Sequence, residues 1–555
     1  MQIQDTSPGP IWRVTTENAT DKPYRVALRF DTKKNLERGQ IAVLAFEART
    51  LNTQSASGVS YIYCYFEPTS APHVKSLKQT IPIGSKWTRV QIPFRAVMTH
   101  PAYKSRLGLG FGFLPQTVEV RNIQLRSAPS THQLGDIERL PKIAYPGQEA
   151  DASWRAAAQA RIAQYRQAPM TIEVLGPDGR PVPKAKVRII MQRHAFGFGS
   201  QVDAVALARD SADARKYQDL VERLYNKVVF QNDLKWGPWL KGERKSLGSR
   251  YSRMAIWKAL DWLEARRIPV RGHWMIHNVL NELPLSSSVL HNPQALRQAL
   301  EEHVREETSA LAGRLVEWDA INHLVGWGTT LTQQIVGLQT FPDLLHLMRR
   351  LDPQVKLYVN EGFILPGGDN DLLTRRDAYA QAIGKLLDLG TPLDGIGFMA
   401  HFDASNLTSP DKLYAILERF SSFGLELQIT EFDVNQVSED LQADYLRDCM
   451  TVCFSHPKVV GFLMWGFWEK AHWRPQAALY REDWSEKPAG RAWRELVFGD
   501  WWTDVAGQTD RQGQFQVRGF LGEYQVEVEA KAGKASANII LPAGGLSHTI
   551  RLGRN

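Results

Sequence analysis

The chain has 555 residues, of which 43% are apolar and 23% charged. These proportions are ordinary for globular protein, and the length predicts about three to four domains. The net charge of +8 is small for this length and no block of Lys or Arg stands out, which argues against a nucleic-acid partner. Cys64, Cys449 and Cys453 are too few for a disulfide framework and are interpreted as buried thiols.

The two ends of the chain and its apolar runs bear on location. No run of ~18 apolar residues occurs, so no membrane span is predicted. Residues 1–5 lack the basic and apolar stretches of a signal peptide. A chain from which a signal peptide has been removed looks the same, and we expect a secreted or periplasmic protein. The sequence does not indicate an oligomeric state.

Residues 1–130 predict an all-β domain. Short runs of alternating apolar and polar residues, separated by turn residues, have the spacing of a β-sandwich. These runs cover residues 24–30, 40–46, 59–66, 87–94 and 107–113. Residues 131–168 predict a connector with a helical, Ala- and Arg-rich stretch over 150–167.

Residues 169–194 predict a β-hairpin. Two apolar runs, 171–175 and 182–191, flank the turn sequence Gly176-Pro177-Asp178-Gly179. Pro, Asp and Gly in this order are typical of a tight turn between antiparallel strands.

Residues 195–500 alternate strand-like and helix-like segments. Eight such units in about 300 residues predict an α/β fold, the (β/α)8 or TIM barrel. The eight strand candidates are 196–202, 227–231, 269–275, 316–322, 356–360, 395–401, 425–430 and 461–467. The tail, residues 501–555, returns to a β pattern. Because an isolated hairpin is marginal in water, we hypothesise that the hairpin and the tail form one small sandwich with the barrel inserted between them.

Polar and aromatic residues follow the predicted barrel strands, where barrels of this kind carry their active sites. Glu431 lies in the run Ile429-Thr430-Glu431-Phe432-Asp433, at the end of an apolar strand. A carboxylate there loses solvation free energy unless it is paired or used. The other strand ends include Asn232-Asp233-Leu234-Lys235-Trp236, Arg271-Gly272-His273, Trp318-Asp319-Ala320-Ile321-Asn322, Gly395 to His401 and Trp465-Gly466-Phe467.

These six motifs, in their order along the chain, resemble those of glycoside hydrolase family 10, the retaining endo-β-1,4-xylanases. The resemblance covers residues 195–497 and implies a polysaccharide or oligosaccharide substrate with no metal or organic cofactor. Residues 1–130 resemble, much more faintly, the carbohydrate-binding jelly rolls of this family.

The resemblance implies a role for each matching residue. Glu431 corresponds to the nucleophile that forms a glycosyl-enzyme. Asn322 would bind the 2-hydroxyl of the sugar, and His401 and Asp433 would orient the nucleophile. The residues that would hold the sugar upstream of the cleaved bond are Asn232, Lys235, His273, Trp465 and Trp473.

The sequence also departs from the family pattern. His323 stands where the family has its acid/base Glu, and Met399 stands where a Gln contacts nucleophile and substrate. His277 replaces a Trp, Gln231 a Glu and Glu361 an Asp. The nucleophile side is therefore kept, while the acid side and part of the sugar-binding shell are changed.

Three interpretations of His323 are open. Its imidazole can serve as general acid/base in place of Glu. Another acid can take that role, with Glu361, Glu469, Asp233 and Glu282 as candidates. Otherwise the protein is a catalytically impaired, glycan-binding protein on a family-10-like barrel. A metal hydrolase is disfavoured, because His273, His323 and His401 lie at strand ends without clustered ligand spacing.

Overall fold

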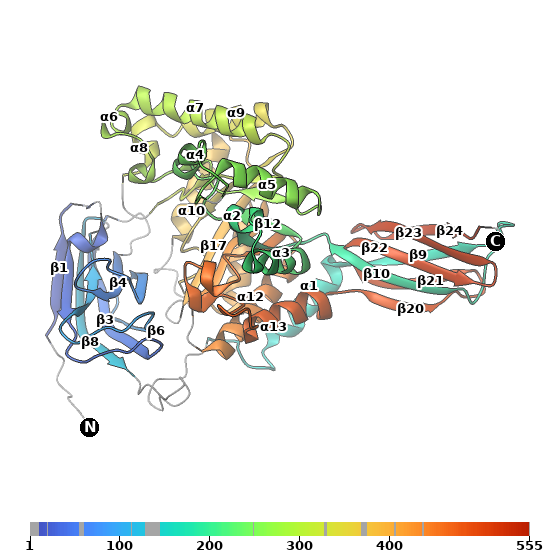
Figure 1. The fold of residues 1–555 in the computed structure, drawn as a ribbon, viewed down its shortest axis with the longest axis horizontal. Helices are drawn as coiled ribbons and strands as arrows, with labels where there is room; N and C mark the ends of the chain where they lie inside the picture. The colour runs from blue at the N-terminus through green and yellow to red at the C-terminus, as the bar shows by residue number, and fades with distance from the viewer. Residues whose placement is uncertain are drawn as a thin grey trace.

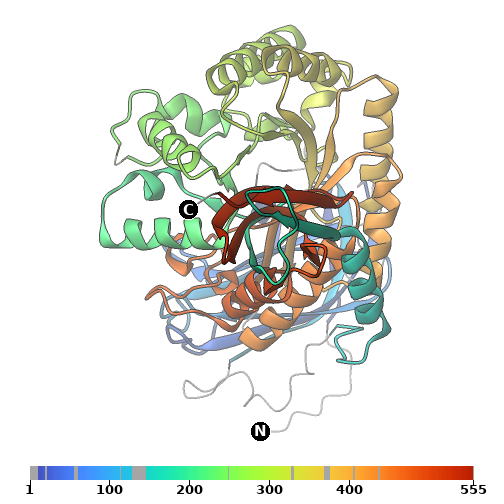
Figure 2. The same ribbon diagram turned by 90° about the vertical axis from the view of Figure 1, so that its right-hand side faces the viewer.

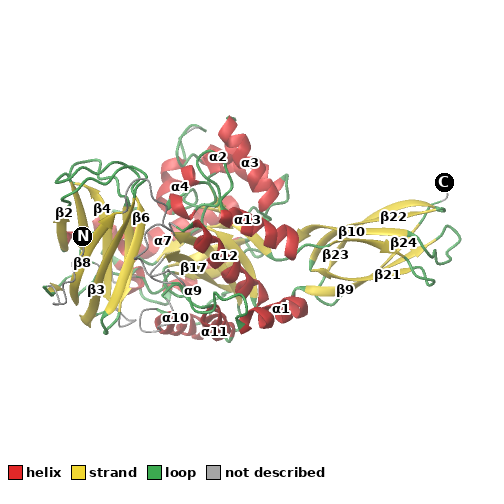
Figure 3. Ribbon diagram, turned by 90° about the horizontal axis from the view of Figure 1, so that it is seen from below, coloured by secondary structure: helices red, strands yellow, loops and turns green. Residues whose placement is uncertain are grey.

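The computed structural model describes residues 10–553, except 19, 21, 55–59, 113, 128–144, 248, 327–329, 368–374, 404–406 and 436–437. A barrel lies between two β modules at its opposite ends, as Figures 1 and 3 show. The part of the predicted connector that covers 131–144 lies outside the described residues. Its helical part is α1 (Ser153–Tyr165), in which Arg155 forms an ion pair with Asp448 of the barrel at 2.6 Å.

The N-terminal module is a sandwich of two antiparallel four-stranded sheets. The alternation along its strands buries one face of each sheet in a shared core that includes Leu44, Ile62 and Phe94. One sheet has the order β1 (Trp12–Thr16), β8 (Gln116–Ser127), β3 (Ile41–Thr53), β6 (Thr88–Arg95). The other has the order β2 (Ala27–Asp31), β7 (Ser105–Gly110), β4 (Ser60–Pro68), β5 (Leu77–Ile83).

The predicted (β/α)8 barrel is confirmed. Its parallel strands run in chain order around a sheet that closes where β19 pairs with β11. The strands are β11 (Gly197–Val202), β12 (Lys227–Phe230), β13 (Val270–Gly272) with β14 (Ile276–His277), β15 (Glu317–Asn322), β16 (Lys356–Glu361), β17 (Gly395–Asp403), β18 (Glu426–Asn435) and β19 (Val459–Met464). Helices cover the sheet from outside, so most strand residues are buried on both faces.

Several barrel helices begin at side-chain caps. Ser211 and Ser438 accept hydrogen bonds from backbone amides of the first turns of α3 and α12, and Asn292 does so before Pro293 of α7. The helices are α2 (Ala204–Ala208), α3 (Ala212–Leu224), α4 (Trp236–Gly242), α5 (Arg253–Glu264), α6 (Ser287–Leu290), α7 (Pro293–Leu311), α8 (Thr332–Val336), α9 (Thr340–Leu351), α10 (Arg376–Asp388), α11 (Pro410–Ser421), α12 (Glu439–Ser455) and α13 (Pro488–Glu495). No helix in the described part of the chain is long and apolar enough to cross a membrane.

The C-terminal module is a second sandwich, which Figure 2 shows in front of the barrel. One sheet has the order β20 (Asp504–Gln508), β10 (Lys186–His194), β22 (Gly522–Ala530), β23 (Gly533–Leu541). The other has the order β21 (Gln514–Phe520), β9 (Gln167–Leu175), β24 (Leu546–Arg551). Strands from before and after the barrel thus share both sheets.

The predicted hairpin is wrong. β9 and β10 lie in different sheets. At the turn between them an isolated bridge joins Leu175 to Pro181, and the backbone amide of Val182 donates to the Val174 carbonyl at 2.9 Å, but no ladder continues from there. Each strand pairs with the tail instead: β9 with β21 and β24, β10 with β20 and β22. The turn residues allow the chain to reverse, but they do not decide which strands pair.

Candidate active site

A cleft of about 870 Å³ lies at the carboxyl ends of the barrel strands. All predicted site residues except Asp433 line it. These residues are Asn232, Lys235, His273, His277, Asn322, His323, Met399, His401, Glu431, Trp465 and Trp473. Asp433 is fully buried beside His401. Parallel strands of one barrel bring their ends together, which is why residues 200 positions apart meet here.

The N-terminal sandwich forms part of the same cleft. Five of its residues line the cleft, all from the sheet that contains β4 and β5 or from the turn before β2: Pro23, Tyr63, Lys78, Gln79 and Thr80. Tyr61 and Tyr65 on the same outward face of β4 are almost fully buried. The sandwich therefore packs over the barrel mouth, a contribution that the sequence alone did not indicate.

Glu431 lies on β18 and is 4% exposed. Its Oε1 accepts a hydrogen bond from Asn360 Nδ2 at 3.0 Å, and its Oε2 lies 3.2 Å from His401 Nε2. Burial alone would raise the pKa of Glu431, but the neighbouring His273, His401 and Lys235 lower it to about 2. The carboxylate is ionised and held in one orientation before any substrate arrives.

A second buried carboxylate orients His401. Asp433 Oδ2 lies 2.9 Å from His401 Nδ1 and accepts a hydrogen bond from Trp473 Nε1 at 2.7 Å, while Arg474 contacts the other oxygen at 3.2 Å. Although burial opposes the charged imidazole, Asp433 and Glu431 raise the pKa of His401 above its ordinary value. Each ring nitrogen of His401 thus faces a carboxylate, so a protonated ring can donate to both.

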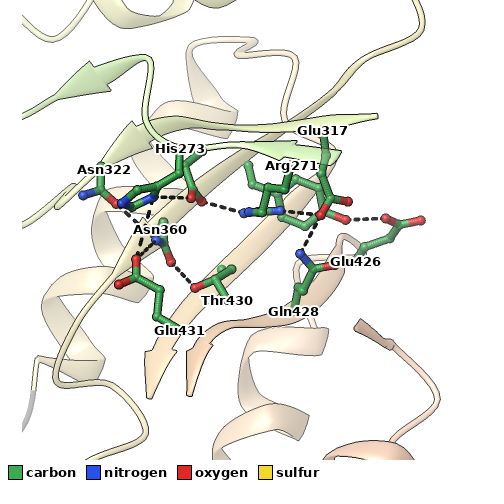
Figure 4. Close-up of polar contacts among 12 residues, drawn as sticks. Arg271, His273, Glu317, Asn322, Asn360, Glu426, Gln428, Thr430 and Glu431 are labelled. Carbon is green, nitrogen blue, oxygen red and sulfur yellow. Dashed lines mark hydrogen bonds and ion pairs between the residues drawn. The ribbon is translucent and has the colours of Figure 1, made fainter. Parts of the chain in front are cut away.

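Asn360 on β16 was not among the predicted site residues, yet it joins two of them. Its Nδ2 donates to Asn322 Oδ1 at 3.1 Å as well as to Glu431, and its Oδ1 accepts from Thr430 Oγ1 at 2.7 Å (Figure 4). Asn322 Oδ1 is therefore already engaged by a hydrogen bond within the site. The available signal was the position of Asn360 at the end of a predicted strand.

A buried ionic network adjoins Glu431, also visible in Figure 4. His273 Nδ1 lies 2.7 Å from Asp319 and 3.8 Å from Glu431, and Arg271 binds both Asp319 and Glu317. His273, Asp319 and Glu431 offer ligand atoms within 4.8 Å of one another. Arg271 already places a cation on Asp319, so this cluster fits hydrogen bonding better than a divalent ion.

His323 directly follows β15 and also lines the cleft. Its Nδ1 lies 3.3 Å from Glu361 Oε1, and its ring packs edge-on against His277 at 5.0 Å. Arg375 Nη1 binds the same Glu361 oxygen at 3.2 Å, and the backbone amide of Val325 donates to the other at 2.7 Å. Burial would raise the pKa of Glu361, but the contacts with His323 and Arg375 hold it below its ordinary value.

The four alternative acids differ in position. Glu361 is buried behind His323 and does not line the cleft. Glu469 forms an ion pair with Lys487 at 3.5 Å and does not line the cleft. Asp233 does not line the cleft either. Its burial, together with the charge of the nearby Asp203, raises its pKa to about 7. Only Glu282 of these four lines the cleft, where it is solvent-exposed.

The remaining predicted residues form the walls. Burial lowers the pKa of Lys235, and the charges of Glu431 and Glu282 partly offset this effect. Burial also lowers the pKa of His277, whose Nδ1 accepts a hydrogen bond from the Val279 amide at 3.2 Å. Trp465 is 6% exposed and contacts His273, whereas Trp473 is 43% exposed. Asn232 and Met399 complete the lining.

Known proteins share the barrel. The relatives found include the anti-sigma-I factor RsgI6 of Acetivibrio thermocellus, 29% identical over 72% of this chain and 49% of its own length. Endo-1,4-beta-xylanase 1 of Arabidopsis thaliana is 26% identical over 71% of this chain and 39% of its own length. The chain thus spans about half or less of these two relatives.

Two matches cover more of the other protein. Endo-1,4-beta-xylanase B of Thermotoga neapolitana is 28% identical over 51% of this chain and 84% of its own length. The structure of xylanase 10B from Thermotoga petrophila with xylobiose matches 55% of this chain and 95% of that chain, at 25% identity and a TM-score of 0.48. The sequence model described as glycosyl hydrolase family 10 matches residues 189–496, more than half of the 555 residues. The chain belongs to glycosyl hydrolase family 10.

Proposed function

We propose that this protein hydrolyses a β-1,4-linked, xylan-like polysaccharide with retention of configuration, and that Glu431 is the nucleophile. The observation that supports this most is the state of Glu431: an ionised carboxylate on the cleft wall, oriented by Asn360 and His401. A carboxylate fixed in this way is poised to attack an anomeric carbon.

The acid/base in this proposal is His323. In the first step a Glu431 oxygen forms a bond to the anomeric carbon, the glycosidic C–O bond breaks, and His323 gives its proton to the leaving oxygen. In the second step His323 takes a proton from water, the water oxygen bonds to the anomeric carbon, and the Glu431 ester bond breaks. Glu361 supports this cycle because it lies against Nδ1 of His323, where a carboxylate can orient the ring and stabilise its protonated form.

The walls of the cleft favour a sugar polymer as substrate. Asn322 would donate to the 2-hydroxyl, Trp465 and Trp473 offer aromatic faces to sugar rings, and Lys235 offers an ammonium group. Xylan is the first choice because several relatives are named endo-1,4-beta-xylanases. A polymeric substrate also favours a secreted or periplasmic protein.

A panel of 2-deoxy-2-fluoro-β-glycosides tests the proposal and the sugar together. The fluorine slows both steps, and an activated leaving group restores the rate of the first, so the glycosyl-enzyme accumulates. We expect intact mass to show one added glycosyl group and peptide mapping to place it on Glu431. The Glu431→Gln variant, with the same shape and no charge, is the matched control and should take no label.

The panel also decides against the proposal if it fails. A label on another carboxylate would remove Glu431 from the nucleophile role. If no sugar labels the protein but oligosaccharides bind measurably, the glycan-binding alternative is favoured. The specific argument for that alternative is that His323 stands where the family has its acid/base Glu.

A further inference from the structure

The N-terminal sandwich contacts the residues behind His323. Tyr61 lies on the outward face of β4 and is 1% exposed. Its hydroxyl oxygen accepts a hydrogen bond from Arg375 Nε at 2.9 Å, and the Arg375 guanidinium lies over the Tyr61 ring at 5.1 Å. Phe363, which follows β16, packs against the same ring at 5.8 Å. This contact joins two modules through buried groups.

The contact continues to the cleft without a break. Arg375 Nη1 binds Glu361 Oε1 at 3.2 Å, and that oxygen lies 3.3 Å from His323 Nδ1. Tyr61, Arg375 and Glu361 are each 2% exposed or less. Hydrogen bonds to charged groups at such depth are strong, and each partner lost leaves a costly unsatisfied group.

The chain of contacts restricts Glu361 in a particular way. One of its oxygens is fixed by the Val325 amide, and the other is shared by Arg375, His323 and the Gly362 amide at 2.9 Å. Without the Tyr61 hydroxyl, Arg375 loses the hydrogen bond that holds its guanidinium in this orientation. The carboxylate would then be less well placed to hold the ring of His323 and to support its charge.

We propose that Tyr61 and Arg375 are positioning residues, through which the N-terminal sandwich fixes Glu361 and so the acid/base ring of His323. The sandwich is then a working part of the active site as well as a neighbour of the barrel. This inference rests on the proposed role of His323. The cleft lining by Tyr63, Lys78 and Thr80 places the same sheet over the barrel mouth independently of the Tyr61 contact.

The test uses Tyr61→Phe, which removes the hydroxyl and keeps the ring. Tyr65→Phe is the matched control. Tyr65 lies on the same strand and face and is equally buried, but its hydroxyl accepts a hydrogen bond from Arg29, at 3.1 Å, and not from Arg375. The readout is kcat/KM on two aryl β-xylobiosides, one with a leaving group that needs protonation and one that does not. Thermal melting checks that both variants fold.

We expect Tyr61→Phe to lower kcat/KM about 10- to 150-fold for the substrate that needs protonation, the usual cost of a lost hydrogen bond to a charged group. The other substrate should change little, and Tyr65→Phe should change neither. The pH profile of Tyr61→Phe should shift along its alkaline limb. Equal losses on both substrates would indicate a merely structural role and overturn the inference, as would a profile like that of Tyr65→Phe.

His323→Gln separates this inference from the proposed function. If His323→Gln loses activity equally on both substrates, the acid role itself fails. If His323→Gln selectively loses the demanding substrate but Tyr61→Phe does not, the acid role stands and only the positioning role of the sandwich is overturned. An Arg375→Lys variant, which keeps the charge and loses the planar fork, should resemble Tyr61→Phe.

Discussion

The Glu431 side and the His323 side of the cleft hold their reactive groups in the same manner. On one side the anion Glu431 is surrounded by an amide, two imidazoles and an ammonium group, and its pKa is about 2. On the other side the imidazole of His323 rests against the anion Glu361. Both groups are fixed by buried hydrogen bonds in advance, so little reorganisation is needed during reaction. Under the proposed function, an imidazole supported by a carboxylate therefore does the work of a carboxylic acid.

The two sides differ in what supports them. Asn360, His401 and Glu431 lie on the neighbouring strands β16, β17 and β18 of one closed sheet. His323 depends on Glu361, on Arg375 at the start of α10, and through it on Tyr61 of another module. The nucleophile side therefore has the rigidity of the barrel, whereas the acid side depends on packing between modules.

The largest expected effect is on the nucleophile side. Glu431→Ala should lower kcat/KM by more than the ~10²–10⁴-fold typical for loss of general acid–base catalysis, because no covalent intermediate can form. Added azide can enter the space left by the carboxylate and attack an activated β-glycoside. The glycosyl azide should then be the α-anomer, detected by NMR. A β-azide product would contradict the assignment of Glu431.

The nucleophile side was predictable because its parts are local in sequence. Glu431 and Asp433 alternate along one strand, and His401 ends the strand beside it, so the end of each apolar run marks a cleft residue. The eight strand candidates followed from the same apolar pattern. Asn360 shows where this stops: its position was visible, but its two partners, 38 and 71 residues away, were not.

The acid side and the C-terminal sandwich were less predictable for one reason. Tyr61 and Arg375 are 314 residues apart, and no pattern in either segment specifies the other. In the same way β9 pairs with β21, so that Glu173 opposes Gln514, although a turn sequence directly follows β9. Contacts between distant segments depend on the shapes of assembled modules, which local propensity does not encode.

A smaller and more selective effect is expected from His323→Ala. Loss of the general acid should cost ~10²–10⁴-fold on substrates with poor leaving groups and much less on activated ones. Azide should accelerate turnover of the activated substrate, and its product should be the β-anomer because it attacks the glycosyl-enzyme. Opposite azide anomers from the two variants would establish the two sides directly, and an α-azide from His323→Ala would contradict the division of roles.

The same comparison predicts a change in pH dependence. Because the pKa of Glu431 is held at about 2, this carboxylate stays ionised well below neutrality, and its own titration does not shape the pH profile near neutrality. A carboxylic acid releases its proton at lower pH than an imidazole. His323→Glu should therefore move the alkaline limb of kcat/KM to lower pH, and an unmoved limb would show that another group supplies the proton.

The smallest effect is expected from Asn360→Ala. This variant tests how far Glu431 Oε1 and Asn322 Oδ1 depend on the side-chain amide of Asn360 for their positions. The variant removes the hydrogen bonds to Glu431 and Asn322 but leaves both of those side chains in place. Losing hydrogen bonds of this kind should lower kcat/KM about 10- to 100-fold. The loss should be the same for activated and poor leaving groups, since the proton donor is untouched.

Thr430→Val, which removes only the hydroxyl bonded to Asn360 Oδ1, is the milder control. A leaving-group dependence in Asn360→Ala would mean that Asn360 also supports His323, whose backbone amide donates to the Asn360 carbonyl at 2.8 Å, and the two sides would then be coupled through β16.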